Sequence, residues 1–201
     1  VPVLSEEGED ISYEERSNWD AYWLVDPLDG TKEFIKKNDE FTVNIALLEK
    51  NQPVFGVVYA PASDIFFWGG DGYGAWKKQG MLKSEEIKVN SEIGKLVKLA
   101  ASRSHPSDKI EKFLLQFENY ELSPMGSSYK ICLVSEGMVD LYPRFGPTME
   151  WDTAASHAIM KAAGGELIQV DNKLPLIYNK LELLNPEFIA GNVDIITNIK
   201  F

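Results

Sequence analysis

Two aspartates, a glycine and a threonine stand close together at positions 26 to 31. Asp26 and Asp29 are followed directly by Gly30 and Thr31. Carboxylate oxygens are ligands that Mg²⁺ prefers, and this ion usually shares its coordination shell with water and a substrate phosphate. The pattern therefore indicates a metal-assisted phosphoester site. An ordinary turn is the alternative, because Asp and Gly also dominate turns.

The residues before this group have the composition of a buried strand. Positions 22–25 are aromatic or aliphatic, and we expect the strand to end at Pro27, which has no N–H to donate to a neighbouring strand. We also expect one or two helical turns over residues 31–37. The free N–H groups at the start of such a helix, beside the flexible Gly30, would bind an anion. Cations would have to separate that anion from the aspartates.

Three further acids lie far from this group in the sequence. Glu6 and Glu7 follow a short apolar stretch, and Asp152 lies in the first turn of a helix expected over residues 150–163. Glu6 and Glu7 are equally typical of a solvated loop, and a carboxylate is favourable at any helix N-terminus. The alternative is that Glu6 and Asp152 join the central aspartates around a metal ion.

Several polar segments have the composition of ligand-binding loops. Residues 102–105 follow a strand expected at 97–102, and ligands of α/β proteins collect at such strand ends. The Gly-Ser-Ser segment at 126–128 precedes an expected helix and fits either an anion cradle or an ordinary cap. Arg144 either clamps a phosphate or lies at the surface. We expect His157 to be packed within its helix and not to bind a metal.

The strand pattern changes along the chain. Closely spaced β-rich runs between residues 41 and 76 predict an antiparallel meander. From residue 97 onward, strands, polar loops and helices alternate, as is typical of α/β architecture. We therefore expect an N-terminal α+β half over residues 1–95, which carries the central acids, and a C-terminal α/β half over residues 96–201.

The composition restricts the partners of the protein. Its 201 residues carry a formal net charge of −11, which argues against non-specific binding of nucleic acid. A phosphate substrate is compatible with this charge if bound divalent cations invert the local potential. The chain has two histidines and one cysteine, which argues against a zinc site built from these residues and excludes an intrachain disulfide.

The same composition gives expectations for location. We expect no transmembrane segment, because no apolar run reaches membrane-spanning length. A single cysteine fits a reducing compartment, so we expect a cytoplasmic protein, with peripheral association at the inner membrane left open. The sequence begins at Val1 inside an apolar stretch, and we expect the natural N-terminus to lie upstream.

Three separated motifs together resemble the inositol monophosphatase superfamily, the lithium-sensitive, magnesium-dependent phosphatases. In order, they match its acidic pair, its D-P-[LI]-D-G-[ST] motif and its distal W-D-x-A-A motif. The matching residues are Ser5-Glu6-Glu7, Asp26-Pro27-Leu28-Asp29-Gly30-Thr31 and Trp151-Asp152-Thr153-Ala154-Ala155. Within the superfamily, the chain is most similar to bacterial 3'(2'),5'-bisphosphate nucleotidases. The segments that carry this similarity are 22–37, 41–61, 102–105, 126–130 and 142–152.

The resemblance implies a layered α-β-α-β-α sandwich with the active site between its two halves. It implies that water activated by two or more Mg²⁺ ions hydrolyses the 3'-phosphate of adenosine 3',5'-bisphosphate, giving AMP and phosphate. It names 3'-phosphoadenylyl sulfate as a related substrate. An inositol or sugar monophosphatase and a non-catalytic, metal-dependent nucleotide-binding protein are the alternatives. The implied partner is a small nucleotide bisphosphate and not a nucleic acid, bound by a monomer or homodimer.

The resemblance also implies individual roles. The implied metal ligands are Glu6, Asp26, the Leu28 carbonyl, Asp29 and Asp152. The implied catalytic residues are Glu6 and Thr31. The implied substrate contacts are Leu28, Gly30, Thr31, Lys32, His105, Gly126, Ser127, Ser128, Lys130, Arg144 and Asp152. In the superfamily, long N-terminal helices precede the acidic pair, and one of them supplies an acid that partners the motif threonine. We expect those helices to be missing from this sequence through truncation.

Overall fold

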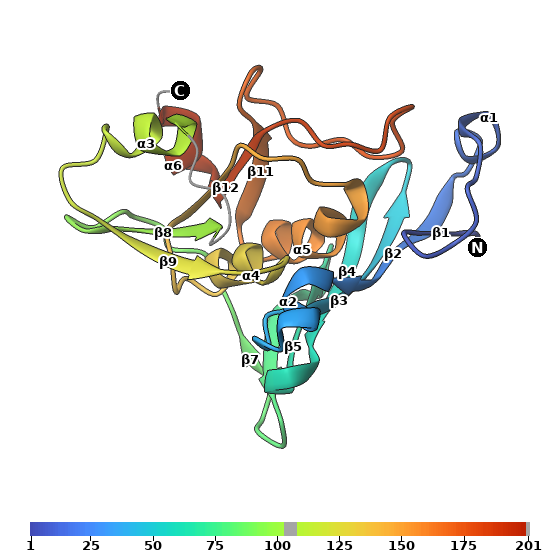
Figure 1. The fold of residues 1–201 in the computed structure, drawn as a ribbon, viewed down its shortest axis with the longest axis horizontal. Coiled ribbons are helices and arrows are strands. Elements are labelled where there is room, and N and C mark those ends of the chain that lie inside the picture. The colour runs from blue at the N-terminus through green and yellow to red at the C-terminus, as the bar shows by residue number, and fades with distance from the viewer. Residues whose placement is uncertain (103–107, 200–201) are drawn as a thin grey trace.

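Two β-sheets, with helices between and beside them, make up the molecule (Figure 1). The structure, a computed structural model, describes residues 1–102 and 108–199. The first sheet consists of β1 (Val3–Ser5), β2 (Ala21–Asp29), β3 (Thr42–Glu49), β4 (Gln52–Ala60), β5 (Ile65–Gly70), β6 (Gly74–Gln79) and β7 (Glu85–Glu86). The second consists of β8 (Val97–Ser102), β9 (Tyr120–Met125), β10 (Leu141–Arg144), β11 (Gly165–Gln169) and β12 (Phe188–Asn192). The α-helices are α1 (Tyr13–Arg16), α2 (Thr31–Lys36), α3 (Asp108–Leu114), α4 (Tyr129–Ser135), α5 (Glu150–Ala162) and α6 (Val193–Asn198).

Both sheets are mixed. Strands of the first sheet follow the chain from β1 to β7, and they are antiparallel except for β1, which runs parallel to β2. The second sheet has the order β11-β12-β10-β8-β9, in which β10, β8 and β9 are parallel. Parallel strands need crossover connections, and α3 and α4 lie within the two crossovers of the second sheet.

The helices form two layers. α4 and α5 lie between the sheets, whereas α3 and α6 pack on the other face of the second sheet (Figure 1). Alternation along β12 shows the two cores directly: Phe188 and Ala190 pack between the sheets, and Ile189 packs toward α3 and α6. The chain therefore stacks as sheet, helices, sheet and helices.

A close contact between α5 and β4 sets the spacing of the first two layers. Ala154, Ala155 and Ala158 are buried on α5, and small side chains let the helix lie near the sheet. Gly56 of β4 meets Ala155 so closely that an added Cβ would lie 2.1 Å from the Ala155 carbonyl oxygen. Because Asp152 stands one turn before this contact, the contact also fixes how far Asp152 lies from the first sheet.

Most of the elements predicted from the sequence are confirmed. The meander predicted between residues 41 and 76 corresponds to β3 to β6, and the helix expected from residue 150 corresponds to α5. The prediction that the strand before the central acids ends at Pro27 is wrong, because β2 continues to Asp29. On one side of β2, the pairing with β1 ends at Val25. No strand therefore lies beside Pro27 on that side, and the N–H that proline lacks is not needed there.

The elements that were not predicted include β9 and α1. β9 lies at the edge of the second sheet, where Pro124 is tolerated, although a proline within a segment argues against a strand. α1 has only four residues, in a segment whose charges are typical of a solvated loop. The first sheet uses residues 3–86 and the second uses residues 97–192, while the expected division into halves at residue 95 stays a prediction. Within the described ranges, no helix is long and apolar enough to cross a membrane.

Replacing Gly56 with alanine tests the helix–sheet contact. The added methyl group would have to displace the backbone of α5, and overpacking of this kind costs about 3 kcal/mol. We therefore expect Gly56→Ala to lower the free energy of unfolding by about that amount in urea titrations. Gly94→Ala is the matched control, because its Cβ would meet nothing closer than 4.0 Å. Equal effects of the two substitutions would contradict this account of the contact.

Candidate active site

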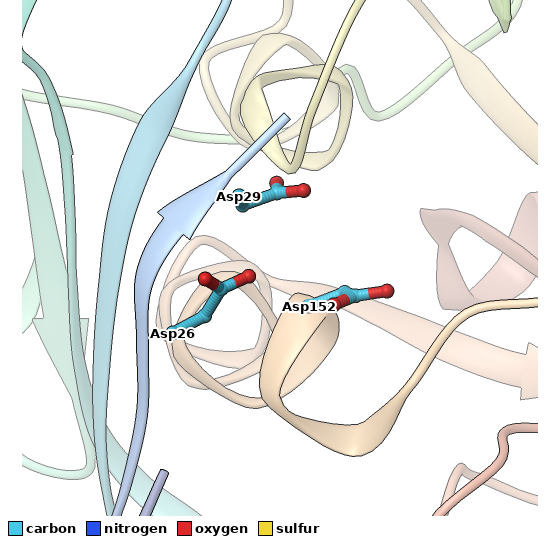
Figure 2. A group of neighbouring side chains, drawn as sticks. All are labelled: Asp26, Asp29 and Asp152. Atoms are coloured by element: carbon cyan, nitrogen blue, oxygen red, sulfur yellow. The ribbon is translucent and has the colours of Figure 1, made fainter. Parts of the chain in front are cut away.

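Three aspartates from two distant parts of the chain meet between the first sheet and α5. Asp26, Asp29 and Asp152 each offer a carboxylate oxygen, and these oxygens lie within 4.8 Å of one another. Figure 2 shows Asp26 and Asp29 at the end of β2, facing the first turn of α5, which carries Asp152. The sequence prediction that Asp152 lies beside the central acids requires this arrangement, and the structure has it.

A bulge in β2 turns both of its aspartates to the same face. Asp26 pairs with Asn44 of β3 and Asp29 pairs with Thr42, so three steps along β2 match two steps along β3. In a regular strand, residues three apart point to opposite faces. One extra residue restores the same orientation. The backbone N–H of Leu28 also donates to Asp26 Oδ1 at 2.9 Å, which fixes that carboxylate within the bulge.

Asp152 is held by the helix it begins. Its Oδ2 accepts a hydrogen bond of 2.9 Å from the backbone N–H of Met149, the residue that precedes α5. This contact satisfies one of the N–H groups left free at a helix start. The expectation that Asp152 is favourable at a helix N-terminus and the alternative that it joins a carboxylate cluster therefore both hold.

Crowding of these acids changes their acidity. Burial, followed by the charges of Asp29 and Glu6, raises the pKa of Asp26 to about 8. Burial and the charge of Asp29 raise the pKa of Asp152 to about 7. Burial also raises the pKa of Asp29, against hydrogen bonds from Ser128 and the charge of Lys130. The metal-free cluster therefore holds protons near neutral pH.

The donor set fits a hard divalent cation. Asp26 is only 1% exposed, and its Oδ2 is buried without a hydrogen-bond partner among the described residues. A buried carboxylate oxygen normally has a partner, so an unpaired one beside two more carboxylates is a position for a cation. All the offered atoms are oxygens, which suits Mg²⁺ better than softer metals.

The remaining predicted ligands lie at the edge of the cluster. Glu6 follows β1, and its backbone N–H donates to the Val25 carbonyl at 3.2 Å. Its side chain is exposed and lies outside the group of three aspartates, yet its charge raises the pKa of Asp26 and Asp152. Thr31 begins α2, and its hydroxyl donates to the Leu28 carbonyl at 3.3 Å. Glu6, Leu28 and Thr31 thus lie close enough to contribute to one site.

A pocket of about 190 Å³ opens beside the aspartates. Eight of the predicted substrate contacts line it: Gly30, Lys32, Gly126, Ser127, Ser128, Lys130, Arg144 and Asp152. His105 lies outside the described residues. His157 is buried and hydrogen-bonds Tyr178 and Glu166, so the expectation of a packed histidine is confirmed.

Ser128 ties the pocket to the aspartates. Its backbone N–H donates to Asp29 Oδ2, and its hydroxyl donates to Asn44 Oδ1 at 2.8 Å and contacts Thr42 Oγ1 at 2.8 Å. The Ser128 side chain makes no helix-capping bond, whereas the Ser127 hydroxyl accepts from the Tyr129 N–H at 3.3 Å. The contact that we expect between Ser128 and substrate stays a prediction.

Two cations, Lys130 and Arg144, also line the pocket. Lys130 is almost fully buried, and its ammonium group donates to the carbonyls of Met125 at 3.2 Å and Ser127 at 2.7 Å. Burial lowers its pKa to about 8, although the charge of Asp29 opposes that change. Arg144 donates to the Pro147 carbonyl at 2.9 Å, while its buried Nε has no partner among the described residues. Both groups retain N–H donors for an anion.

Sequence reasoning missed some of the pocket. Thr42 and Asn44 support Asp29 and Ser128 from β3, and Tyr142 and Thr153 line the pocket. A signal for Thr42 and Asn44 was present, because these polar residues occupy alternate positions of β3 that point into the core. Tyr142 and Thr153 had no such signal, since aromatic strand residues and helical threonines are usually packing residues.

A family model described as the inositol monophosphatase family matches residues 1–198. The chain belongs to this family. The resemblance read from three motifs is thereby confirmed, as is the predicted layered fold class. The part of the chain that the structure describes forms four layers, in the order sheet, helices, sheet and helices.

Individual relatives indicate a narrower group than the family model does. The chain is 48% identical over 188 residues to the 3'(2'),5'-bisphosphate nucleotidase CysQ of Salmonella typhimurium, covering 94% of this chain and 74% of that protein. The CysQ of Haemophilus influenzae is 39% identical, over 94% of this chain and 71% of its own length.

Solved structures of other proteins have the same fold as this chain. A crystal structure of CysQ from Bacteroides thetaiotaomicron matches with a TM-score of 0.89 and 47% identity, covering 96% of this chain and 77% of that one. Inositol monophosphatase-II of Staphylococcus aureus matches with a TM-score of 0.77 and 21% identity over 98% of this chain and 73% of that one. The second comparison bears on the fold alone.

Asp26→Asn tests the electrostatic account of the cluster. The raised pKa means that ionised Asp26 costs folding free energy, a cost that is absent below the unfolded value of 3.8 and grows as the pH rises to about 8. We expect the metal-free variant to melt at a higher temperature than the wild type at about pH 8. The difference should shrink as the pH falls toward 4. Circular dichroism melts in a chelator measure it.

Magnesium should have the opposite effect on the same pair of proteins. We expect Mg²⁺ to bind the folded wild type and to raise its melting temperature, and we expect Asp26→Asn to respond much less. Asp71→Asn, at an exposed turn between β5 and β6, is the control for the chemical change. An equal rise in Asp26→Asn and the wild type would show that Asp26 does not bind the cation.

Proposed function

We propose that the chain is a Mg²⁺-dependent 3'(2'),5'-bisphosphate nucleotidase. It hydrolyses the 3'-phosphate of adenosine 3',5'-bisphosphate to AMP and phosphate, and 3'-phosphoadenylyl sulfate is a related substrate. The observation that carries this proposal is one pocket beside a carboxylate cluster, lined by Asp29, Asp152 and the two cations Lys130 and Arg144. The names of the relatives at 48% and 39% identity support the same substrate class.

The cation ligands follow from the cluster. Asp26, Asp29 and Asp152 would hold the metal, with Glu6 and the Leu28 carbonyl completing the set for a second ion. When bound, Mg²⁺ supplies Lewis acidity, which neutralises phosphoryl charge and increases the acidity of water. This addition of positive charge reconciles a net charge of −11 with an anionic substrate.

Residues of β2 and α2 would orient the reacting groups. The Thr31 hydroxyl donates its hydrogen to the Leu28 carbonyl, so its lone pairs remain free to accept a hydrogen bond from the attacking water. Gly30 adopts a left-handed conformation with φ of 86°, and this conformation leads the backbone from β2 into α2. Its N–H and that of Thr31 would bind the phosphate undergoing hydrolysis.

Lys130 and Arg144 would select for a second phosphate. Lys130 uses two of its three N–H groups on carbonyls, which leaves one for a ligand, and the Arg144 Nε is unpaired within the described ranges. Charge-assisted hydrogen bonds from these groups are stronger than neutral ones. One phosphate of a bisphosphate would bind the metal ions held by the carboxylates. The other phosphate would bind Lys130 and Arg144.

Phosphate release from matched substrates tests the proposal. With Mg²⁺, we expect faster turnover of adenosine 3',5'-bisphosphate than of AMP or inositol monophosphate, and no turnover in a chelator or in Asp26→Asn. Equal rates on the bisphosphate and inositol monophosphate would favour a general monophosphatase. Cation-dependent binding of the bisphosphate without any phosphate release would instead support a non-catalytic binding protein.

Lys130→Met tests the second phosphate site. Loss of one charge-assisted contact should raise KM for the bisphosphate about tenfold or more and change kcat less. The ammonium group is present below its pKa of about 8 and is lost above it, so KM of the wild type should rise as the pH increases past 8. Lys130→Met should lack that rise. A KM that follows the same pH dependence in both proteins would remove Lys130 from the site.

A further inference from the structure

Three buried polar residues outside the pocket form one hydrogen-bonded group. Arg16 is 3% exposed, Glu150 is fully buried and Asn179 is 4% exposed. They come from α1, from the first turn of α5 and from the segment between β11 and β12. Burying charged groups is costly unless they are paired, so a group of this kind fixes the elements that supply it.

Glu150 anchors the segment around Asn179 to α5. Its carboxylate accepts hydrogen bonds from the Asn179 N–H at 2.7 Å, the Lys180 N–H at 3.1 Å and the Lys180 ammonium at 2.5 Å. Glu150 stands two residues before Asp152 in the same helical turn. Any shift of this segment is therefore transmitted to the turn that carries Asp152.

The Asn179 side chain then pairs with Arg16 in both directions. Its Oδ1 accepts from the Arg16 guanidinium at 2.8 Å, and its Nδ2 donates to the Arg16 carbonyl at 2.8 Å. The guanidinium also donates to the Leu181 carbonyl at 2.9 Å. The charges of Glu150 and Arg16 both act on Tyr22. Burial is the largest cause of the raised pKa of Tyr22, Glu150 raises it further and Arg16 lowers it.

Arg16 is the main anchor of the segment that leads away from Glu6. Between Ser5 and the start of β2, Arg16 is the only buried residue, with Ile11 and Trp19 half-buried. The segment is otherwise held by the three-residue pairing of β1 with β2 and by Ile11 and Trp19, which pack against the core. Arg16 and Asn179 therefore join the segment that carries Glu6 to the helix that carries Asp152.

We propose that Arg16 and Asn179 are positioning residues for the cation site, which hold Glu6 in place against Asp152. This inference rests on the proposed function, since it assigns both acids to bound Mg²⁺. Neither residue lines the pocket, so each acts through the acid on its own side of the contact. Loss of the contact should weaken cation binding more than substrate binding.

Asn179→Gly removes the contact, together with the hydrogen bond of 3.0 Å from Asn179 Nδ2 to Asn51 Oδ1. Asn179 has a left-handed φ of 59°, which glycine adopts freely, and the backbone N–H that binds Glu150 is retained. The direct measurement is Mn²⁺ binding by electron paramagnetic resonance, with Mn²⁺ as the probe. We expect about tenfold weaker binding, as is usual when residues that orient metal ligands are lost. KM for the bisphosphate at saturating Mg²⁺ should change less than about twofold.

Arg16→Met gives an independent route to the same loss. Both substitutions remove the hydrogen bond from the Arg16 guanidinium to Asn179 Oδ1. Arg16→Met should therefore weaken Mn²⁺ binding by a similar factor, and the double variant should be little weaker than the worse single one. If Asn179→Gly fails to fold, Arg16→Met alone decides the question. Additive effects of the two substitutions on Mn²⁺ binding would contradict a shared contact.

Lys77→Met separates positioning from stability. Lys77 of β6 forms an ion pair with the largely buried Glu136 at the end of α4, and neither residue lines the pocket. This control should lower the melting temperature while leaving Mn²⁺ affinity unchanged. If the Asn179 and Arg16 variants behave in the same way, the inference is overturned and the proposed function stands. If the wild type neither binds Mn²⁺ nor releases phosphate, both fail.

Discussion

Repulsion between buried carboxylates is the interaction around which this fold is arranged. Without a bound metal ion, the pKa values of all three aspartates, Asp26, Asp29 and Asp152, are raised, because water is largely excluded and like charges face one another. The rest of the structure supplies the packing that holds them together, above all the contact of Gly56 with Ala155. The carboxylate cluster thus lowers the folding stability of the metal-free protein and provides a site that binds positive charge.

The sequence allowed most of the fold to be predicted, because alternation and turn residues report local structure. β3 to β6 and α5 followed from such patterns. The end of β2 did not, since its continuation past Pro27 depends on where the neighbouring strand β1 stops. The short helix α1 was also missed, because its charged sequence conceals the burial of Arg16.

The site was predictable to the extent that its residues share a motif. The spacing of Asp26 and Asp29 suggested a metal site. Asp152 was an alternative ligand that the resemblance favoured, and the structure places it beside them. Contacts such as Arg16 with Asn179 could not be predicted, because they join segments 163 positions apart and leave no periodic pattern. Polar pairs of this kind are specified by tertiary packing alone.

Because β2 has a bulge between Asp26 and Asp29, the number of residues between the two aspartates determines which face of the sheet each one points to. The two residues between Asp26 and Asp29 supply backbone, and neither is paired with a residue of β1 or β3. A deletion of one residue there would keep both acids in the chain yet leave one of them pointing into solvent on the opposite side of the sheet. Relatives that share the chemistry should therefore have neither insertions nor deletions between the two aspartates.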